Sequence, residues 1–425
     1  MVNTETINQI TQSLKEPAWV TELRKKSLAR HAELPWPHSS DDIWRRIDAS
    51  LLDPAKGFTP VKPELLQKIA LSQAQLTQFT QPLGDEQLFV RVNGSWLNEA
   101  QAAGFTIKEG IDTVRGVVEA DGLTGAEQKL SSLNLAFHHD DVTVEVPARF
   151  AVQQPIRFLR IFSAAPKQAL FPMTVITVGK GASVTIIDEY LSLDSQSPEP
   201  HLINARIELA LEADATVNYI RLQRWGKTAR EFLLQRATLG KGSTLNMANI
   251  NLGASFSKAH IVTKLAGEYS TANLSGFVFG HDKQHIDQHT LQDHQAAHTT
   301  SDLHINAALQ DESRMTYTGL IRIAKQAAQT NAFQSNHNLM LSKTARAETI
   351  PMLEILADDV QCKHGASIGP IDDEQAFYLM SRGISRENAQ RLIVMGFVET
   401  IIKKLPFEPL QERLRAEIEG SIHSE

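Results

Sequence analysis

The chain has 425 residues, a formal net charge of −7 and a single cysteine. Its length predicts two or three domains and enough apolar material for a sizeable core. The acidic balance and the lack of a long basic block exclude a nucleic-acid backbone as the main partner, and one cysteine excludes an internal disulfide framework.

No apolar run in the sequence approaches the roughly 20 residues that a helix needs to span a bilayer. The first residues also lack the basic and apolar regions of a secretory signal. We therefore expect a cytoplasmic protein with no membrane and no nucleic-acid partner.

Residues 1–86 are predicted to form an N-terminal helical region. Apolar positions are scattered along charged faces there, and prolines interrupt the pattern. A short helix is expected around Trp44, with Ser40 or a following aspartate as its cap, and we expect this tryptophan to pack the N-terminal helices. The helical runs are expected at residues 6–18, 21–33 and 64–81.

Residues 87–368 are predicted to form a β core, because the apolar period changes to two at Gln87. The middle of this region repeats a short strand, a small or polar turn and a second short strand. Offsets between the aligned turn positions are about 33, 28, 27, 43, 15 and 17 residues, near multiples of one coil of a β-solenoid. The aligned positions are Ser183, Thr216, Thr244, Thr271, Arg314, Gln329 and Arg346.

Stacked coils of this kind bury one continuous apolar column, while each strand pairs with the coils above and below. A parallel β-helix is therefore the predicted architecture, and a β-sandwich is the alternative. Two Gly-Lys-Gly segments, at residues 179–181 and 240–242, lie between predicted strands with no helix after them. We expect them to be solenoid turns rather than nucleotide-binding loops.

Residues 369–425 return to a helical period. One helix is expected between Asp372 and Gly383, and Ser385 is expected to cap the next. A final charged helix is expected at residues 410–418. The middle helix carries an apolar stripe at helical spacing, which consists of Ala389, Leu392, Ile393, Gly396, Phe397, Thr400 and Ile401.

The single cysteine, Cys362, stands two residues before His364. On an extended strand these side chains project from the same side of the backbone, so a thiolate and an imidazole are able to reach one soft or borderline metal ion. Two ligands make an incomplete site, and the spacing therefore indicates a shared or transient one. The alternative is a buried cysteine beside a surface histidine.

A second run of metal-binding side chains lies upstream. Neutral imidazoles bind transition metals well, which makes an iron or zinc site conceivable. Asp, Gln and Thr residues alternate with these histidines, however, and this pattern is typical of solvated solenoid positions, so we expect a polar surface strip. The histidines are His281, His285, His289, His294, His298 and His304.

The sequence lacks a Gly-x-x-x-x-Gly-Lys-Ser/Thr phosphate loop and a His-Glu-x-x-His zinc motif. We therefore expect a protein that hydrolyses no ATP by itself and is not an enzyme. One alternative is a β-helix enzyme acting on polysaccharide, although the clustered carboxylates of such enzymes do not recur here at coil spacing. Another alternative is a standalone His-rich metal-binding protein.

Two longer segments surround the cysteine and its histidine. Residues 354–366 read Glu-Ile-Leu-Ala-Asp-Asp-Val-Gln-Cys-Lys-His-Gly-Ala, and residues 373–384 read Asp-Glu-Gln-Ala-Phe-Tyr-Leu-Met-Ser-Arg-Gly-Ile. Together they resemble the C-terminal signature of the SufB/SufD family of iron–sulfur cluster assembly scaffolds. The resemblance implies a right-handed parallel β-helix core and a noncatalytic scaffold subunit.

The resemblance also implies partners: a SufB-like scaffold subunit and a SufC-like ABC-type ATPase. Nascent clusters form between the two scaffold subunits in this family, so Cys362 and His364 are carried over as ligands of a transient iron or iron–sulfur site, which the isolated chain does not hold stably. Without its partner the chain is expected to be able to form a homodimer by edge pairing. The C-terminal helices are implied to dock the ATPase, with contact or core positions at Phe377, Tyr378, Arg382, Ile393 and Phe397.

Overall fold

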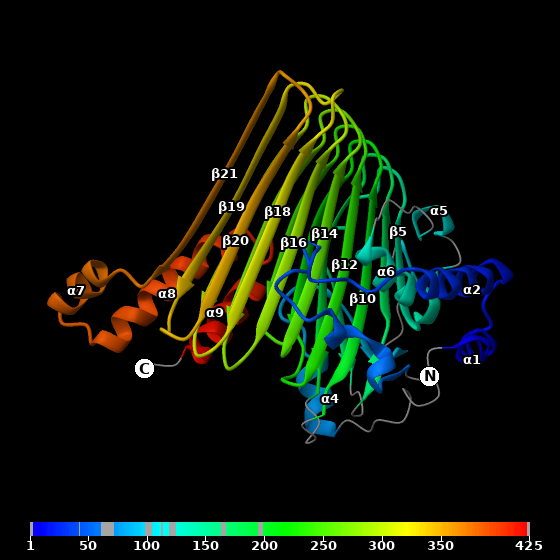
Figure 1. Ribbon diagram of the computed structural model, residues 1–425, viewed down its shortest axis with the longest axis horizontal. Helices are drawn as coiled ribbons and strands as arrows, with labels where there is room; N and C mark the ends of the chain where they lie inside the picture. Colours follow the sequence, from blue (N-terminus) through cyan, green and yellow to red (C-terminus); the bar gives the residue numbers. More distant parts are fainter. Residues whose placement is uncertain are drawn as a thin grey trace.

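The centre of the protein is a parallel β-solenoid with helices at both ends of the chain (Figure 1). Successive coils pair in parallel, so the β-helix prediction is confirmed and the β-sandwich alternative is wrong. The structure is a computed structural model that describes residues 3–41, 43–60, 72–97, 104–111, 114–118, 125–162, 167–193 and 199–422.

Two sheets form the walls of the solenoid, and each coil contributes one strand to each sheet. In the first sheet, sheet A, β4 pairs antiparallel with β5, and all other pairs are parallel, including that of the short β1 with β7. The strands of sheet A are β1 (Thr59–Pro60), β4 (Thr106–Glu109), β5 (Asp140–Val146), β7 (Gln168–Leu170), β8 (Pro172–Val178), β10 (His201–Leu211), β12 (Ala229–Leu239), β14 (Phe256–Leu265), β16 (His285–His294), β18 (Arg314–Ile323) and β20 (Arg346–Ile355).

The second sheet, sheet B, faces sheet A across the solenoid interior. Its order is β21-β19-β17-β15-β13-β11-β9-β6-β2-β3, with an antiparallel hairpin between β2 and β3 at one end. The strands are β2 (Gln87–Val92), β3 (Ser95–Trp96), β6 (Ile156–Phe162), β9 (Ser183–Ser192), β11 (Thr216–Arg224), β13 (Thr244–Asn251), β15 (Thr271–Gly280), β17 (Thr300–Leu309), β19 (Thr330–Met340) and β21 (Val360–Pro370).

The repeat predicted from the sequence agrees with the observed register in its first half. The first four aligned turn positions lie side by side on successive coils of sheet B, which confirms that part. The last three leave this column, because Arg314 and Arg346 pair in sheet A and Gln329 lies in the turn before β19. Their offsets are about one and a half coils for the first and half a coil for the other two, since each coil places one strand in each sheet. The confirmed positions are Ser183, Thr216, Thr244 and Thr271.

The turns that lead into sheet B share one backbone conformation. On six successive coils a residue with positive φ precedes the aligned strand position by two residues, and the values run from 56° to 66°. Glycine tolerates this left-handed region best, yet it occupies only two of the six places. Both Gly-Lys-Gly segments lie at such turns, as predicted. The six residues are Gly181, Asp214, Gly242, Tyr269, His298 and Gln329.

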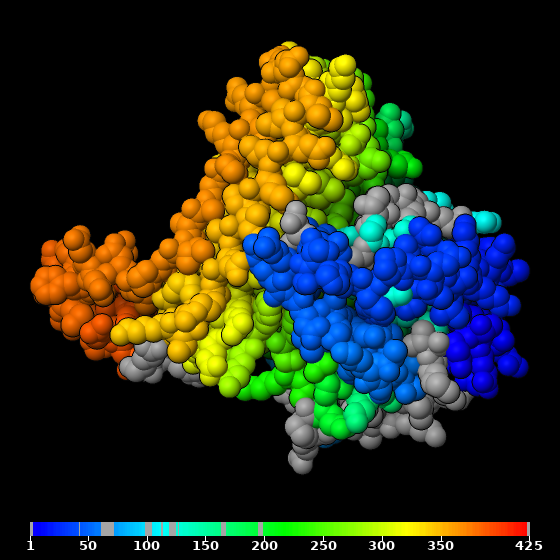
Figure 2. Space-filling model, viewed as in Figure 1, coloured from blue at the N-terminus to red at the C-terminus, as the bar shows by residue number. Residues whose placement is uncertain are grey.

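Helices from the N-terminal region and α6 cover the outer face of sheet A (Figures 1 and 2). Asn134 of α6 donates from Nδ2 to the carbonyl oxygen of Asn204 at 2.6 Å, and Asn204 donates back to Leu130 at 2.8 Å. Trp44 is buried and its ring stacks on Phe232 of β12. The elements on this face are α1 (Thr4–Leu14), α2 (Ala18–Glu33), η1 (Ala49–Leu52), η2 (Pro54–Lys56), α5 (Arg115–Val118) and α6 (Ala126–Phe137), whereas α4 (Gln73–Thr80) contacts β2 of sheet B.

The predicted N-terminal helices exist with shifted boundaries. The first break falls at Lys15, which has a φ of 52°, and Pro17 caps the start of α2. The helix predicted around Trp44 is wrong, since residues 43–46 form turns. Of the run predicted at residues 64–81, α4 is the described part, and residues 64–71 lie outside the described residues.

The C-terminal helices are α7 (Asp373–Ser381), α8 (Arg386–Ile402) and α9 (Glu408–Ser421). Helices α8 and α9 pack on the outer face of sheet B, where Val394 and Leu414 join a cluster with Ile220. The stripe predicted for α8 is wrong in part, because Leu392 is 52% exposed. The sequence of α8 is apolar on several sides, so its period alone could not select the buried face, which consists of Ala389, Val394, Val398, Ile401 and Ile402.

A buried carboxylate also attaches α9 to the solenoid. Glu189 of β9 accepts hydrogen bonds from Arg413 of α9 at 3.0 Å, from Arg224 at 2.9 Å and from Arg157 at 3.0 Å. Burial alone would raise the pKa of Glu189, but the three guanidinium groups lower it to about 2. The ionised carboxylate is therefore part of the folded state, and α9 is held by charge as well as by apolar packing.

We expect Glu189→Gln to lower the free energy of unfolding, and to lower it less at acidic pH. The pKa of Glu189 falls from its ordinary 4.5 to about 2 on folding, so its contribution is complete above pH 4.5 and is lost as the pH falls through 2. That difference corresponds to about 3 kcal/mol. Urea unfolding from pH 3 to pH 7 should show a deficit for the variant that is largest at pH 7 and shrinks at pH 3. The exposed Glu22→Gln is the control, and a deficit for Glu189→Gln that does not change with pH would contradict this account.

Candidate functional site

The solenoid ends in an open edge formed by β20 and β21, which lie at the ends of their sheets (Figure 1). Leu353 and Ile355 continue the inward-facing positions of Ile321 and Ile323 on the previous coil. The two earlier residues are fully buried, whereas Leu353 is 39% and Ile355 is 41% exposed. The apolar interior of the solenoid is therefore open at this end.

Cys362 and His364 lie on the inward face of β21 at this opening. In the register of sheet B, Cys362 follows Ala332 and His364 follows Gln334, and both of those residues are buried on β19. Cys362 is half-buried against the small cluster that contains Ala332, while His364 is exposed. The strand alternation thus places both predicted ligands on one face, where a further coil would otherwise cover them.

The two side chains do not complete a metal site on their own. Among the described residues, neither Cys362 nor His364 belongs to a group of three His, Cys, Asp or Glu ligand atoms within 4.8 Å of one another. Burial raises the pKa of the Cys362 thiol above its ordinary value of 9.0, so the thiol is protonated at neutral pH. An iron ion at this site would need further ligands and would displace a proton.

The predicted contact residues of the C-terminal helices fall into two groups. Phe377 and Tyr378 of α7 are exposed, at 72% and 58%, and the guanidinium of Arg382 lies 5.2 Å from the Tyr378 ring centroid. Ile393 and Phe397 of α8 are half-buried instead. Because α7 projects away from the solenoid (Figures 1 and 2), Phe377, Tyr378 and Arg382 form a protruding surface, here called the α7 patch.

The six histidines of the upstream run do not share one face. His294 points inward, where its ring nitrogens bond Thr299 at 2.7 Å and Ser301 at 2.8 Å, and burial lowers its pKa to about 4. His298 lies in a turn and stacks on Tyr269. His289 faces outward but is buried, so the prediction of a solvated strip is wrong for this residue. Strand alternation and the turns on both sides of β16 separate the six side chains.

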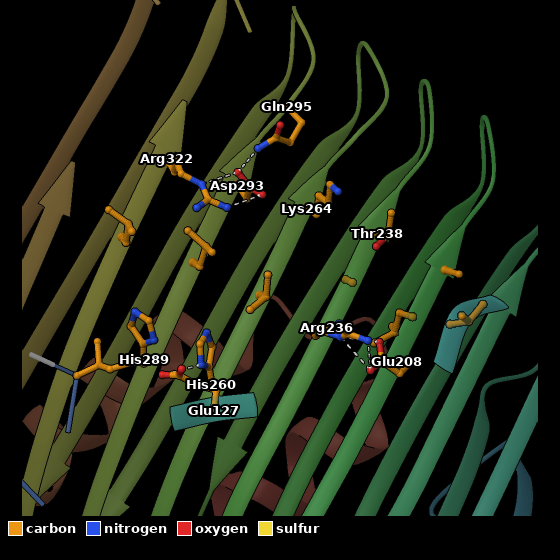
Figure 3. Close-up of a pocket in the computed structure, with 18 of the residues that line it drawn as sticks. Glu127, Glu208, Arg236, Thr238, His260, Lys264, His289, Asp293, Gln295 and Arg322 are labelled. Atoms are coloured by element: carbon orange, nitrogen blue, oxygen red, sulfur yellow. Dashed lines mark hydrogen bonds and ion pairs between the residues drawn. The ribbon is translucent and has the colours of Figure 1, made fainter. Parts of the chain in front are cut away.

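His289 lies against two residues outside the predicted histidine run, His260 and Glu127. It pairs in register with His260 of β14, and their ring centroids lie 4.5 Å apart. His260 Nδ1 lies 3.5 Å from Glu127 Oε1 of α6 (Figure 3). Ligand atoms of Glu127, His260 and His289 all lie within 4.8 Å of one another. The two histidines are 29 residues apart, so the coil period is the signal that could have paired them.

This cluster lies at the edge of a pocket of about 650 Å³ on the outer face of sheet A (Figure 3). The other charged side chains of the pocket are largely paired: Arg236 contacts Glu208 at 2.8 Å, and Arg322 contacts Asp293 at 3.0 Å. Glu208 and Asp293 are therefore held by guanidinium groups and Glu127 faces His260, so the pocket does not present the pair of free carboxylates that a glycosidase uses.

Comparison with known protein families matches residues 161–397 to the family described as "SUF system FeS cluster assembly, SufBD core domain". This match covers more than half of the chain. The chain belongs to the SufBD family. The match includes the edge strand with Cys362 and His364, as well as the α7 patch.

Three relatives illustrate the range of similarity within the SufBD family. SufD of Escherichia coli is 31% identical over 243 residues, and the alignment spans 57% of each chain. An iron–sulfur cluster assembly SufBD family protein of Synechocystis is 27% identical over 96% of this chain and 94% of its own length. A SufBD family protein of Staphylococcus saprophyticus is 25% identical over 98% of this chain and 93% of its own length. The chain is therefore a SufBD family protein of iron–sulfur cluster assembly.

One serine motif of this SufBD family protein resembles a hydrolase signature. Residues 365–369 read Gly-Ala-Ser-Ile-Gly, the pattern of a nucleophile elbow, which requires a sharp turn from a strand into a helix. Here the segment is extended within β21, and Ser367 Oγ bonds His337 Nδ1 at 2.7 Å. The backbone lacks the elbow, so the motif does not indicate a serine hydrolase. In the described part of the chain, no helix is long and apolar enough to cross a membrane.

We expect the folded chain to protect Cys362 from alkylation. Because burial raises the pKa of this thiol and the thiolate is the reactive form, iodoacetamide at pH 7 should react several-fold more slowly with the native protein than with the protein in 6 M guanidinium chloride. Intact-mass spectrometry gives both rates directly, since the chain has one cysteine. The native rate should rise as the pH is increased beyond 9. Equal native and denatured rates at pH 7 would show that the thiol is not perturbed.

Proposed function

We propose that this chain is a noncatalytic, cytoplasmic scaffold subunit of a SUF-type complex, in which it pairs with a SufB-like subunit and binds a SufC-like ABC-type ATPase. The single observation that carries this proposal is the position of Cys362 and His364 on the inward face of an uncovered terminal coil. A binding partner at this edge would cover the apolar interior and supply the missing ligands. Membership of the SufBD family supports the same conclusion.

The terminal strands have the features of a pairing surface. Edge strands with exposed backbone groups and apolar side chains are sites of strand addition or association. At this edge Leu353, Ile355, Leu356 and Ile368 are between 39% and 60% exposed. A partner solenoid edge would continue the interior column and return these side chains to an apolar environment. A second copy of this chain is able to use the same edge, so a homodimer is expected when the SufB-like subunit is absent.

The ligand chemistry at the edge fits a nascent cluster that is handed on rather than kept. Cysteine thiolate and neutral imidazole both bind iron. Cys362 carries a raised pKa, so iron binding must expel a proton, and two ligands from one chain leave positions open for a partner's ligands. Iron and sulfide are the cargo in this proposal, and the isolated chain should hold neither stably at this edge.

The α7 patch is the proposed docking surface for the ATPase. Phe377 and Tyr378 are exposed aromatic side chains of the kind that anchor protein interfaces, and Arg382 provides a charged rim. Helix α7 packs against α8, and α8 and α9 are fixed to sheet B by apolar packing and by Glu189. Movement of a bound ATPase subunit would therefore be passed to the solenoid as a rigid body and would shift the open edge.

We expect His364→Ala to lower cluster assembly by the complex without unfolding the chain. The side chain is exposed at the open end, so the thermal midpoint should change by less than about 2 °C. Cluster formation is measured by absorbance and by transfer to an apo-ferredoxin in the reconstituted complex. His337→Ala, on the outward face of the neighbouring strand β19, is the matched control. If the intact complex with His364→Ala assembled clusters as the wild type does, His364 would not be a ligand in cluster formation.

A pull-down of the tagged chain from its native lysate should show that the open edge and the α7 patch bind different partners. Leu356→Asp with Ile368→Asp places charges on the open edge and should remove the SufB-like subunit but keep the ATPase. Phe377→Asp with Tyr378→Ala should remove the ATPase but keep the SufB-like subunit. Tyr269→Asp, an exposed aromatic in a turn elsewhere on the solenoid, is the control. Recovery of both partners with all variants, or of neither with the wild type, would contradict the proposal.

A further inference from the structure

Three potential ligands converge on the outer face of sheet A, supplied by three different elements. Glu127 comes from the first turn of α6, His260 from β14 and His289 from β16 (Figure 3). Their exposures are 5%, 7% and 6%. One oxygen and two nitrogen ligand atoms lie within 4.8 Å of one another. The two histidines are one coil apart, so the register of β14 and β16 brings them together, and the packing of α6 on sheet A adds Glu127.

The polar atoms of this cluster are poorly satisfied by the protein itself. Within the described residues, neither ring nitrogen of His289 has a hydrogen-bond partner, and Nδ1 of His260 has none. A buried polar group left without a partner is energetically unfavourable, because it has lost its hydrogen bonds to water. Native structures usually explain such groups by a bound water, ion or ligand. An imidazole without a partner therefore lies beside a second imidazole whose Nδ1 is 3.5 Å from the Glu127 carboxylate, and this is a set of donors that is able to bind a cation.

A second cluster of similar composition shows the contrast. Glu16, His138 and Asp141 also lie within 4.8 Å of one another. There the buried guanidinium of Arg24 donates to Glu16 and to the carbonyl oxygen of His138. An internal cation therefore already neutralises that cluster, and a metal ion would have to displace the Arg24 guanidinium. The cluster around His289 has no such occupant among the described residues.

The donor set specifies the class of ion. Two imidazole nitrogens and one carboxylate oxygen form the zinc-binding set of several hydrolases and the facial triad that holds Fe(II), whereas Ca²⁺ and Mg²⁺ prefer oxygen ligands. We propose that Glu127, His260 and His289 form a binding site for a divalent first-row transition-metal ion such as Fe(II) or Zn(II). The adjacent pocket of about 650 Å³ leaves room for water or a small anion at the remaining coordination positions.

Neighbouring residues orient the ligands as the surroundings of metal sites commonly do. Trp44 donates from Nε1 to Glu127 Oε1 at 3.3 Å, which fixes the carboxylate. Lys258, on the same strand as His260, donates to Asp287 at 2.6 Å and to the carbonyl oxygen of Ile43 at 2.7 Å. The positive charge nearest the site is therefore neutralised by its own carboxylate. Metal–ligand distances of about 2.0–2.2 Å require small side-chain rotations that bring the three ligand atoms closer.

This site is separate from the open edge. Cys362 and His364 lie on β21, the terminal strand of sheet B, whereas His260 and His289 lie on interior strands of sheet A and face the opposite side of the sheet from the solenoid lumen. The proposal goes beyond the scaffold function and does not rest on it. A chain that fails to assemble clusters would still bind metal here.

The test uses the purified full-length chain, stripped of metal and titrated with Co(II) as an optical probe, with Zn(II) in competition. We expect one equivalent of tightly bound Co(II). His260→Ala and His289→Ala should each weaken binding at least 10-fold, as should Glu127→Gln, which preserves size. The Cys362→Ala, His364→Ala double variant and the surface variant His304→Ala should bind as the wild type does. Circular dichroism checks the fold of each variant.

X-ray absorption of the Co(II)-loaded wild type provides a second measurement that does not depend on any variant folding. Nitrogen and oxygen ligands with the scattering of two imidazoles support the site. A Co–S contribution would place the metal at Cys362 and overturn the proposal. Failure of the wild type to bind Co(II) or Zn(II) at 50 µM free metal would also overturn it, as would unchanged affinity in folded His260→Ala and His289→Ala.

Discussion

In-register parallel pairing between coils is the constraint on which the rest of this structure depends. Each backbone group of a coil bonds to the coils on either side, so a residue's neighbours are set by the coil period rather than by proximity in sequence. The pairing creates columns of equivalent positions that run through the solenoid. Both proposed sites are properties of such columns: one lies where a column stops, and the other where two histidines occupy adjacent positions of the same column.

Cys362 and His364 are accessible because the columns of stacked residues end at their coil. On an interior coil these inward positions hold buried residues such as Ala332 and Gln334. At the last coil the same backbone geometry leaves a thiol half-covered and an imidazole in solvent. A partner would therefore serve two separate purposes. It would bury the apolar side chains that are exposed at the edge, and it would supply the further ligands that a metal ion needs beside Cys362 and His364.

Much of the architecture could be predicted from the sequence. The alternating period and the spacing of Ser183, Thr216, Thr244 and Thr271 identify single coils, and the Cys-x-His spacing places both side chains on one face. Other features depend on tertiary context. Both sheets have similar strand starts, so spacing could not show that Arg314 belongs to sheet A. Helix α8 is apolar on several sides, and Glu127 joins His260 only because α6 packs on sheet A. The sequence alone carries no signal for that last contact.

The attachment of α9 to an early coil has a consequence for how the chain is made. A solenoid is quasi-one-dimensional, and its coils are able to form one after another as they leave the ribosome. Arg413 and Glu189 are 224 residues apart, so the ionic contact on the early coil is completed only after at least 224 further residues have been synthesised. Until then a buried carboxylate and two arginines lack their last partner. Completion of the C-terminus thus couples the first coils to the last helix, and folding changes from a local process into a cooperative one.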